Sequence, residues 1–189
     1  MKKKTLHLQY NSPAVLSFAL LSLGVLLLNL FTGGRSNRML FSVYRCSLLD
    51  PLAYPRFFLH VLGHANFTHY ISNMMLILVV GPPLEEKYGS RPLLWAIGVT
   101  ALVSGLVHWL FFPGAALLGA SGIVFMMIVM SSLAGMKEGK LPLTLVLVLL
   151  LYLGGEILDG LTRQDKVSQL THIIGGLCGA GLGLAFRRK

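Results

Sequence analysis

The sequence predicts an all-α polytopic integral membrane protein, a single bundle of six transmembrane helices. Of its 189 residues, 54% are apolar and only 12% are charged, against about 25% charged residues in a typical soluble domain. The mean hydropathy is +0.72, and apolar runs near the ~20 residues needed to cross a bilayer recur along the chain. These observations exclude a disordered chain and a disulfide-stapled mini-protein, and they argue against a soluble domain.

The apolar runs divide the chain into a short basic tail at residues 1–12 and one membrane domain at 13–186. The first run is longer than the apolar part of a signal peptide, and residues 32–35 do not form a cleavage site, so we expect an uncleaved helix. Residues 33–65 mix arginines with apolar side chains, which is typical of a loop in the membrane interface whose arginines reach toward water. The six expected helices cover about 14–31, 67–84, 93–112, 119–136, 141–158 and 167–186.

The charge distribution predicts the orientation. The net charge of +9 comes from 16 basic and 7 acidic residues. With six spans, ten basic residues fall on the side of the two tails and six on the other side, so the positive-inside rule puts both termini in the cytoplasm. We expect the membrane to be a bacterial inner membrane. No basic stripe with interleaved aromatic residues is present, so nucleic acid is not an expected partner.

Ionisable and polar residues inside the spans are costly, and each is therefore a candidate for function. His69 and Asn73 are four residues apart and share one helix face. Both can donate a hydrogen bond to a developing negative charge. The alternative is that the pair only bonds to neighbouring helices. His108, beside Trp109, is expected at the membrane interface, and Glu85 is expected to have a structural role in a turn.

Ser121 lies between small residues, in the sequence Gly-Ala-Ser-Gly at 119–122, near the start of the fourth expected helix. Gly119 and Gly122 would allow close approach of a substrate or another backbone. The Ser121 amide would lie among the N–H groups that have no partner within the helix, where the helix dipole favours an anion. The alternative is a small-residue packing face.

His172 precedes Gly175 and Gly179 in the sixth expected helix, in a pattern of small residues that lets a neighbouring helix come close. If the fourth helix is that neighbour, His172 reaches Ser121 and can take its proton as a general base. No carboxylate within either span is available to orient the imidazole, so the pair would act as a dyad. The alternative is a histidine that is hydrogen-bonded in a tight bundle.

These motifs, in this order, resemble those of the rhomboid family of intramembrane serine proteases. The resemblance covers about residues 54–184 and comprises G-x-S-G at Ser121, H-x-x-G-x-x-x-G from His172, and H-x-x-x-N on His69 and Asn73. Phe125 stands where the family commonly has an aromatic residue beside the catalytic histidine. The first loop departs from the family, since Pro-Arg at 55–56 replaces the usual Trp-Arg.

The resemblance implies an endopeptidase that cleaves single-span membrane proteins within the bilayer, near their non-cytoplasmic end and through an acyl-enzyme. Ser121 would be the nucleophile and His172 the base. The oxyanion hole would consist of His69, Asn73 and the Ser121 amide. Neither a metal nor another cofactor is expected, and the H-E-x-x-H motif is absent. The alternatives are an inactive rhomboid-like scaffold that binds transmembrane helices, a processing enzyme for C-terminal sorting tails, and a small transporter with a polar path.

Overall fold

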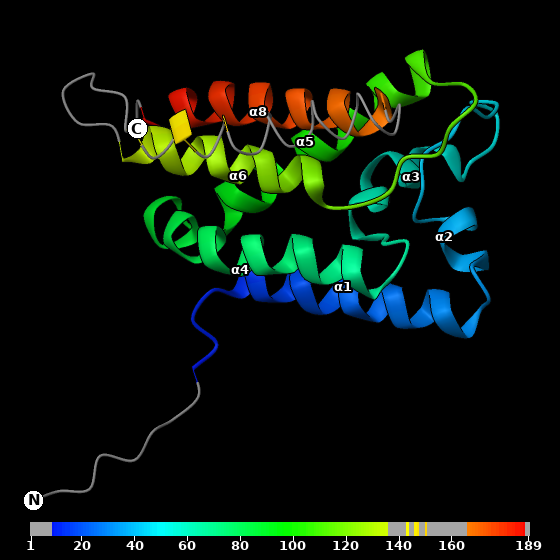
Figure 1. The fold of residues 1–189 in the computed structure, drawn as a ribbon, viewed down its shortest axis with the longest axis horizontal. Helices are drawn as coiled ribbons and strands as arrows, with labels where there is room; N and C mark the ends of the chain where they lie inside the picture. The colour runs from blue at the N-terminus through cyan, green and yellow to red at the C-terminus, as the bar shows by residue number, and fades with distance from the viewer. Residues whose placement is uncertain (1–8, 136–142, 144–145, 148–149, 151–165, 188–189) are drawn as a thin grey trace, which may run out of the picture.

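The computed structural model in Figure 1 describes residues 9–135, 143, 146–147, 150 and 166–187. The predicted helix at 141–158 lies outside the described residues except for the four single positions. The elements, in order, are α1 (Pro13–Phe31), α2 (Arg35–Met39), α3 (Ala53–Leu59), the 3₁₀ helix η1 (His60–Leu62), α4 (Phe67–Tyr88), α5 (Ser90–Phe111), α6 (Ser121–Ala134) and α8 (Lys166–Arg187).

The described part of the chain is all-helical, as predicted, with one isolated bridge between Val43 and Leu117 in place of a sheet. Four helices are long and apolar enough to cross a membrane, namely α1, α4, α5 and the part of α8 at 169–186. Their ends agree with the expected spans to within four residues. The chain is therefore a multi-pass helical membrane protein.

Helix α6 is the exception, because it has only 14 residues and begins two residues later than expected. Its length is about 21 Å at 1.5 Å per residue, shorter than the ~30 Å hydrocarbon core. Gly119 has a φ of +124°, which is not helical, so the helix cannot begin there. Every residue from Gly122 to Met130 is buried, which is expected of a helix that is apolar on all sides.

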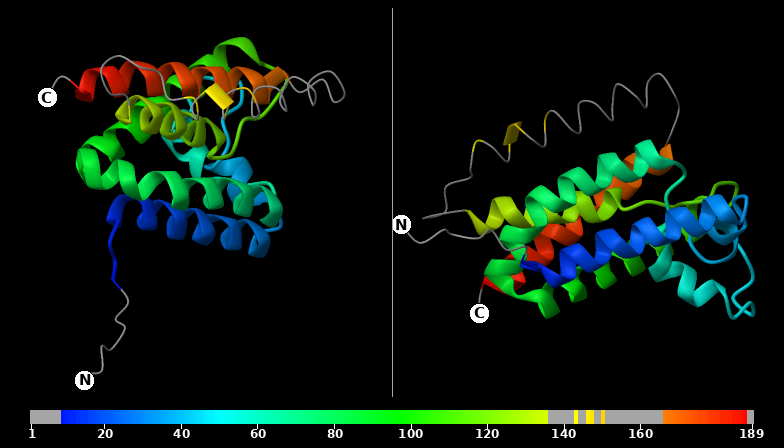
Figure 2. Two further views of the ribbon diagram at one scale, coloured as in Figure 1. Left: turned by 60° about the vertical axis from the view of Figure 1, so that its left-hand side comes forward. Right: turned by 90° about the horizontal axis from the view of Figure 1, so that it is seen from below.

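Helix α6 lies between α4 on one side and α8 on the other. Helices α1 and α4 lie side by side, α6 packs on α4, and α8 covers α6, while α5 contacts all four (Figure 1). Helix α1 begins and α8 ends at one end of the bundle, and α2 and α3 gather at the other end (Figure 2). Helices α4, α6 and α8 all begin at the end near α2 and α3, and this brings the starts of three distant segments together.

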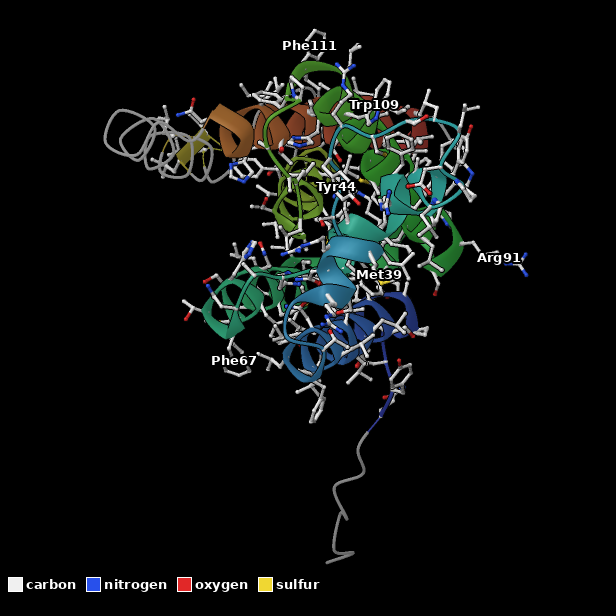
Figure 3. All side chains as sticks on the ribbon, turned by 90° about the vertical axis from the view of Figure 1, so that its right-hand side faces the viewer. Met39, Tyr44, Phe67, Arg91, Trp109 and Phe111 are labelled. Carbon is white, nitrogen blue, oxygen red and sulfur yellow. The ribbon has the colours of Figure 1, made fainter. Side chains whose placement is uncertain are left out.

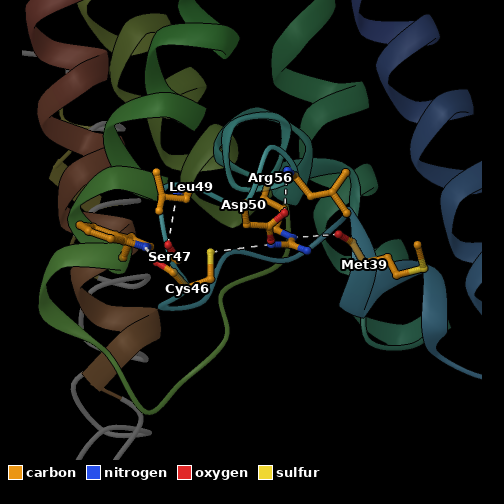
Figure 4. A network of polar contacts seen from close by, with 8 residues as sticks. Met39, Cys46, Ser47, Leu49, Asp50 and Arg56 are labelled. Atoms are coloured by element: carbon orange, nitrogen blue, oxygen red, sulfur yellow. Dashed lines mark hydrogen bonds and ion pairs between the residues drawn. The ribbon is translucent and has the colours of Figure 1, made fainter.

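The predicted interfacial loop at 33–65 contains α2, α3 and η1, and one of its arginines is buried instead of reaching water. Arg56 is 5% exposed. Its guanidinium pairs with Asp50 at 2.8 Å and donates to the Met39 carbonyl at 2.8 Å (Figure 4). It also lies over the Tyr44 ring. The backbone N–H of Leu52 and the Arg56 guanidinium lower the pKa of Asp50, which keeps the carboxylate charged for this pair.

A second arginine fastens the same loop to the end of α5. The Arg45 guanidinium donates to the Leu110 carbonyl at 2.8 Å and lies 4.6 Å from the centre of the Trp109 ring. The indole N–H of Trp109 donates to the Cys46 carbonyl at 3.2 Å. The loop and the end of α5 are therefore joined by two hydrogen bonds, one donated by a side chain of each to a backbone carbonyl of the other.

Glu85, near the end of α4, caps the start of α1. Its carboxylate accepts hydrogen bonds from the amides of Ala14 and Val15, at 2.8 and 2.9 Å, and from the Ser90 hydroxyl at 2.7 Å. The amides at the start of a helix have no partner within it, and the negative charge also complements the helix dipole. This buried carboxylate therefore joins α1, α4 and α5, the structural role expected from the sequence.

Replacing Glu85 with alanine should lower the stability of the fold, because two buried amides at the start of α1 lose their acceptor. A buried donor left without a partner costs about 1–3 kcal/mol. The midpoint of thermal unfolding in detergent measures this loss. Glu86→Ala is the matched control, since Glu86 is exposed. Equal midpoints for the two variants would contradict the capping role.

Candidate functional site

Ser121 is the first residue of α6, and it is partly exposed between the buried residues Ala120 and Gly122. The first hydrogen bond of the helix runs from the Val124 amide to the Ala120 carbonyl at 2.9 Å, so the Ser121 amide lies ahead of it, as the sequence predicted. The positive end of the helix dipole therefore coincides with the serine.

The segment before Ser121 is held at three points. The His108 Nε2 lies 3.1 Å from the Ala115 carbonyl. Leu117 pairs with Val43 through two backbone hydrogen bonds of 2.9 and 2.8 Å, and the Gly119 amide donates to the His60 carbonyl at 3.0 Å. His108 is 2% exposed and its ring stacks on Phe112. His108 is therefore buried beneath the loop after α5, and its expected depth at the membrane interface stays a prediction.

The ring of His69 lies against Gly119. A Cβ atom at Gly119 would come 2.7 Å from Cε1 and 2.8 Å from Nε2 of His69. The positive φ favours glycine at this position, and an added Cβ would also displace the His69 ring. The structure thus brings the predicted histidine of α4 next to the backbone that leads into Ser121.

Helix α8 packs on α6 through the predicted glycines. A Cβ atom at Gly175 would overlap the Gly122 carbonyl oxygen, and one at Gly179 would come 2.5 Å from the Met126 carbonyl oxygen. A Cβ atom added at Gly122 would lie 3.2 Å from the methyl group of Thr171. The sixth expected helix is therefore the direct neighbour of the fourth, as the histidine hypothesis required.

His172 lies on this interface and is 3% exposed. Its ring stacks on Phe125, with ring centres 4.5 Å apart and planes 19° from parallel. Phe125 is four residues after Ser121, so both lie on one face of α6. The side chain of His172 is therefore on the face of α6 that carries Ser121, one helical turn along it.

Asn73 follows His69 by one turn of α4 and is 4% exposed. Its side-chain amide donates to the His69 carbonyl at 3.1 Å. Asn66 caps the helix, since its side-chain oxygen accepts from the His69 amide at 2.8 Å. This cap sets the start of α4 and with it the direction of the His69 side chain. An asparagine just before an apolar run is a signal that sequence reasoning could have used.

Two further histidines support the site, and the sequence assigned them no role. The ring of His64 meets that of His69 edge to face, with centres 5.1 Å apart, and His64 is itself held through its carbonyl by the Asn37 side chain at 3.0 Å. His60 Nε2 lies 3.1 Å from the Ala101 carbonyl. Both side chains are buried, and burial lowers the pKa of each to about 4.

Acidification should therefore destabilise the protein well before its carboxylates are protonated. Between pH 6.5 and 4, the unfolded chain binds protons at His60 and His64 that the folded chain does not, so the free energy of unfolding falls as the pH falls. The slope is about 1.4 kcal/mol per pH unit for each histidine. Thermal unfolding in detergent at pH 7, 5.5 and 4.5 measures it. His64→Leu should have a shallower dependence, and a flat profile in the native protein would contradict the neutral buried state.

Within the described residues, no three histidine, cysteine, aspartate or glutamate side chains are grouped as metal ligands. The polar groups at the start of α4, α6 and α8 are instead a hydroxyl, imidazole rings and a carboxamide, at one end of a bundle of membrane-spanning helices. Hydroxyl and imidazole groups can exchange protons, and the amide and imidazole can donate to an anion. Fold and site together define a polytopic helical membrane protein with a polar centre built on a short central helix.

The chain belongs to the rhomboid family. Residues 52–189 match the Rhomboid domain, a range that starts just before α3 and includes all the residues described above on α4, α6 and α8. This agrees with the resemblance carried by the three motifs.

Curated relatives come from plants and animals. The chain is 31% identical over 134 residues to Rhomboid-like protein 11, chloroplastic, of Arabidopsis thaliana, covering 63% of this chain and 48% of that protein. It is 30% identical over 141 residues to Rhomboid-related protein 1 of Caenorhabditis elegans, covering 68% of this chain and 38% of that protein. For Rhomboid-related protein 2 of Mus musculus the identity is 30% over 143 residues, covering 68% of this chain and 46% of that protein. The chain spans less than half the length of these relatives.

Proposed function

We propose that the protein is an intramembrane serine endopeptidase that cleaves transmembrane-helix substrates near their non-cytoplasmic end. Family membership supports the protease class. The observation that carries the proposal is the position of His172, stacked on Phe125 one turn from Ser121 across the glycine contact of α6 and α8. Serine and histidine on adjoining helices can form a nucleophile and its base.

In the proposed reaction, His172 takes the proton of the Ser121 hydroxyl while the oxygen attacks a peptide carbonyl of the substrate. The tetrahedral intermediate collapses to an acyl-enzyme, and His172 returns the proton to the leaving amine. Water then repeats the attack on the ester, with His172 again as base, and releases the second product. The stacked Phe125 would hold the imidazole plane in both steps.

The developing oxyanion would accept hydrogen bonds from the Ser121 amide, from His69 and from Asn73. His69 already lies against the backbone at Gly119. The Asn73 amide, which donates to the His69 carbonyl of its own helix, would turn toward the substrate. Donors aimed at developing charge in a site shielded from water are among the strongest contributions to catalysis.

A transmembrane substrate hides its backbone in hydrogen bonds, so it must unwind before the serine can attack. We therefore expect helix-destabilising glycine, serine or proline near the scissile bond. The basic residues of the loops favour both termini in the cytoplasm, which would put Ser121 toward the opposite side. Cysteine-accessibility labelling in intact cells tests this orientation.

Asn73→Ala should lower kcat by about 10²–10³, the usual cost of one oxyanion donor, and leave activity measurable. The residual activity comes from the other two donors. Cleavage of a single-span reporter in liposomes measures it. Ser72→Ala is the matched control, because the exposed Ser72 hydroxyl bonds only to its own helix at the Thr68 carbonyl. An unchanged kcat in Asn73→Ala would remove Asn73 from the oxyanion hole.

Labelling with a fluorophosphonate tests the proposal most directly. The native protein in detergent should be labelled, and Ser121→Ala should not. Ser132→Ala, on the same helix with its hydroxyl bonded to the Ile128 carbonyl, should be labelled like the native protein. A folded native protein that is not labelled would overturn the protease proposal and favour a scaffold that binds transmembrane helices.

A further inference from the structure

An apolar groove runs along the membrane-facing side of α5, away from the site just described. Its volume is about 540 Å³, and its lining includes Arg91, Trp95, Gly98 and Leu102 of α5 and Phe58 of α3. Trp95 is 65% exposed and Phe58 46%. Because α5 is one of the helices long and apolar enough to span the membrane, its exposed side chains in the groove would face lipid, together with the adjoining Phe58.

The groove has a closed end and an open end. Helix α3 crosses α5 at Gly105, where an added Cβ would come 3.0 Å from the Phe57 carbonyl oxygen and 3.2 Å from its Cα. The adjoining Phe58 therefore closes the groove just beyond Leu102. The other end opens at Arg91, in the first turn of α5, and the Arg91 side chain extends outward from the bundle (Figure 3).

The dimensions of the groove match one leaflet of a bilayer. Arg91 and Leu102 are eleven positions apart in the sequence, which is about 16 Å along a helix, and half of the hydrocarbon core is about 15 Å. Arg91 would therefore lie at the level of the lipid phosphates, while the stretch from Trp95 to Phe58 would lie at the level of an acyl chain.

The positive charge of Arg91 at the open end of the groove favours an anionic lipid. Within the described part of the chain, Arg91 forms no ion pair with a carboxylate, so its guanidinium can bind a phosphate through two hydrogen bonds. In a zwitterionic lipid the headgroup cation competes for that phosphate, whereas an anionic headgroup adds charge of the favourable sign. Gly98 leaves the floor of the groove open, because a Cβ there would meet nothing within 4 Å.

We propose that this groove binds one anionic phospholipid, with its phosphate on Arg91 and one acyl chain along Trp95 and Gly98 as far as Phe58. This lipid would contact both α5 and α3. The site is distinct from Ser121 and His172, and its existence does not depend on the proposed protease activity.

The chain offers an internal reporter, because Trp95 and Trp109 are its two tryptophans. In a Trp109→Phe protein, only Trp95 fluoresces, and phenylalanine keeps a ring beneath Arg45. Vesicles of phosphatidylcholine containing either brominated phosphatidylglycerol or brominated phosphatidylcholine would quench Trp95 according to which lipid occupies the groove. We expect an about fivefold preference for phosphatidylglycerol, the ratio that ~1 kcal/mol per arginine at an anionic surface implies.

Two pairs of variants locate the effect. Arg91→Gln should abolish the preference, whereas Arg38→Gln, at an exposed arginine of α2, should retain it. Gly98→Leu should fill the groove and remove the preference, and the Cβ of the leucine would meet nothing within 4 Å. Gly24→Leu should not remove it, because Gly24 also has open space but lines a groove on α1 with no basic residue.

Equal quenching by both lipids, or a preference that survives Arg91→Gln or Gly98→Leu, would overturn the proposal. A preference lost equally in Arg38→Gln would also overturn it, because the attraction would then be a general effect of net charge. If Trp109→Phe does not fold, native mass spectrometry of the otherwise unaltered chain replaces the fluorescence. Bound phosphatidylglycerol should then persist in the native protein and be lost in Arg91→Gln, and its equal retention in both would overturn the site.

Discussion

Under the proposed mechanism, replacing His172 with alanine is expected to lower the rate of peptide-bond cleavage by about 10⁴ or more, as loss of the base does in serine hydrolases. The imidazole contacts the face of α6 that carries Ser121 through its stack on Phe125. Without it the serine hydroxyl keeps its proton and remains a weak nucleophile. Cleavage of a single-span reporter in liposomes measures the loss.

Ile173→Ala is the matched control for His172→Ala, since Ile173 is the next residue of α8 and is 51% exposed toward the surroundings. It should retain activity within a few-fold of the native protein. Thermal unfolding of both variants separates a loss of chemistry from a loss of fold. A folded His172→Ala protein that cleaves within tenfold of the native rate would remove the histidine from the mechanism, even if Ser121 is reactive.

Gly175→Ala should have the largest effect on stability of any single methyl group added to α8. The new Cβ would overlap the Gly122 carbonyl oxygen and would lie 2.9 Å from the Gly122 carbon and 3.0 Å from its Cα. All three are backbone atoms, so the two helices must move apart. Overpacking of a core by one group costs about 1–3 kcal/mol, and we expect the upper end here. The shift of α8 should also carry His172 away from Ser121 and lower activity.

Gly176→Ala is the control, because its Cβ would lie 3.9 Å from the Val129 side chain, an ordinary contact. Its stability and fluorophosphonate labelling should match those of the native protein. The midpoint of thermal unfolding in detergent and the rate of labelling measure both effects. A Gly175→Ala protein as stable and as reactive as Gly176→Ala would show that the close approach of α6 and α8 is not required.

The membrane class and most of the helix positions could be predicted because they depend on local composition. A run such as 13–31 is apolar for its whole length, and a polypeptide in lipid must satisfy its backbone within a helix. The candidate residues Ser121, His69, Asn73 and His172 could also be found, since polar side chains within such runs are costly and stand out. The order of their motifs indicated the family.

What the tertiary structure decided are the contacts between residues far apart in the chain. Hydropathy does not show which helices are neighbours. It also does not show that α6 is short and surrounded by other helices, or that Arg56 is buried with Asp50 instead of reaching water. It also gave no role to His64, whose ring is packed against His69. The sequence by itself determined that the chain lies in a membrane and which side chains are out of place there. Only packing, through glycines whose missing side chains let α8 reach α6 and His69 reach Gly119, decided which of the segments that carry those side chains lie together.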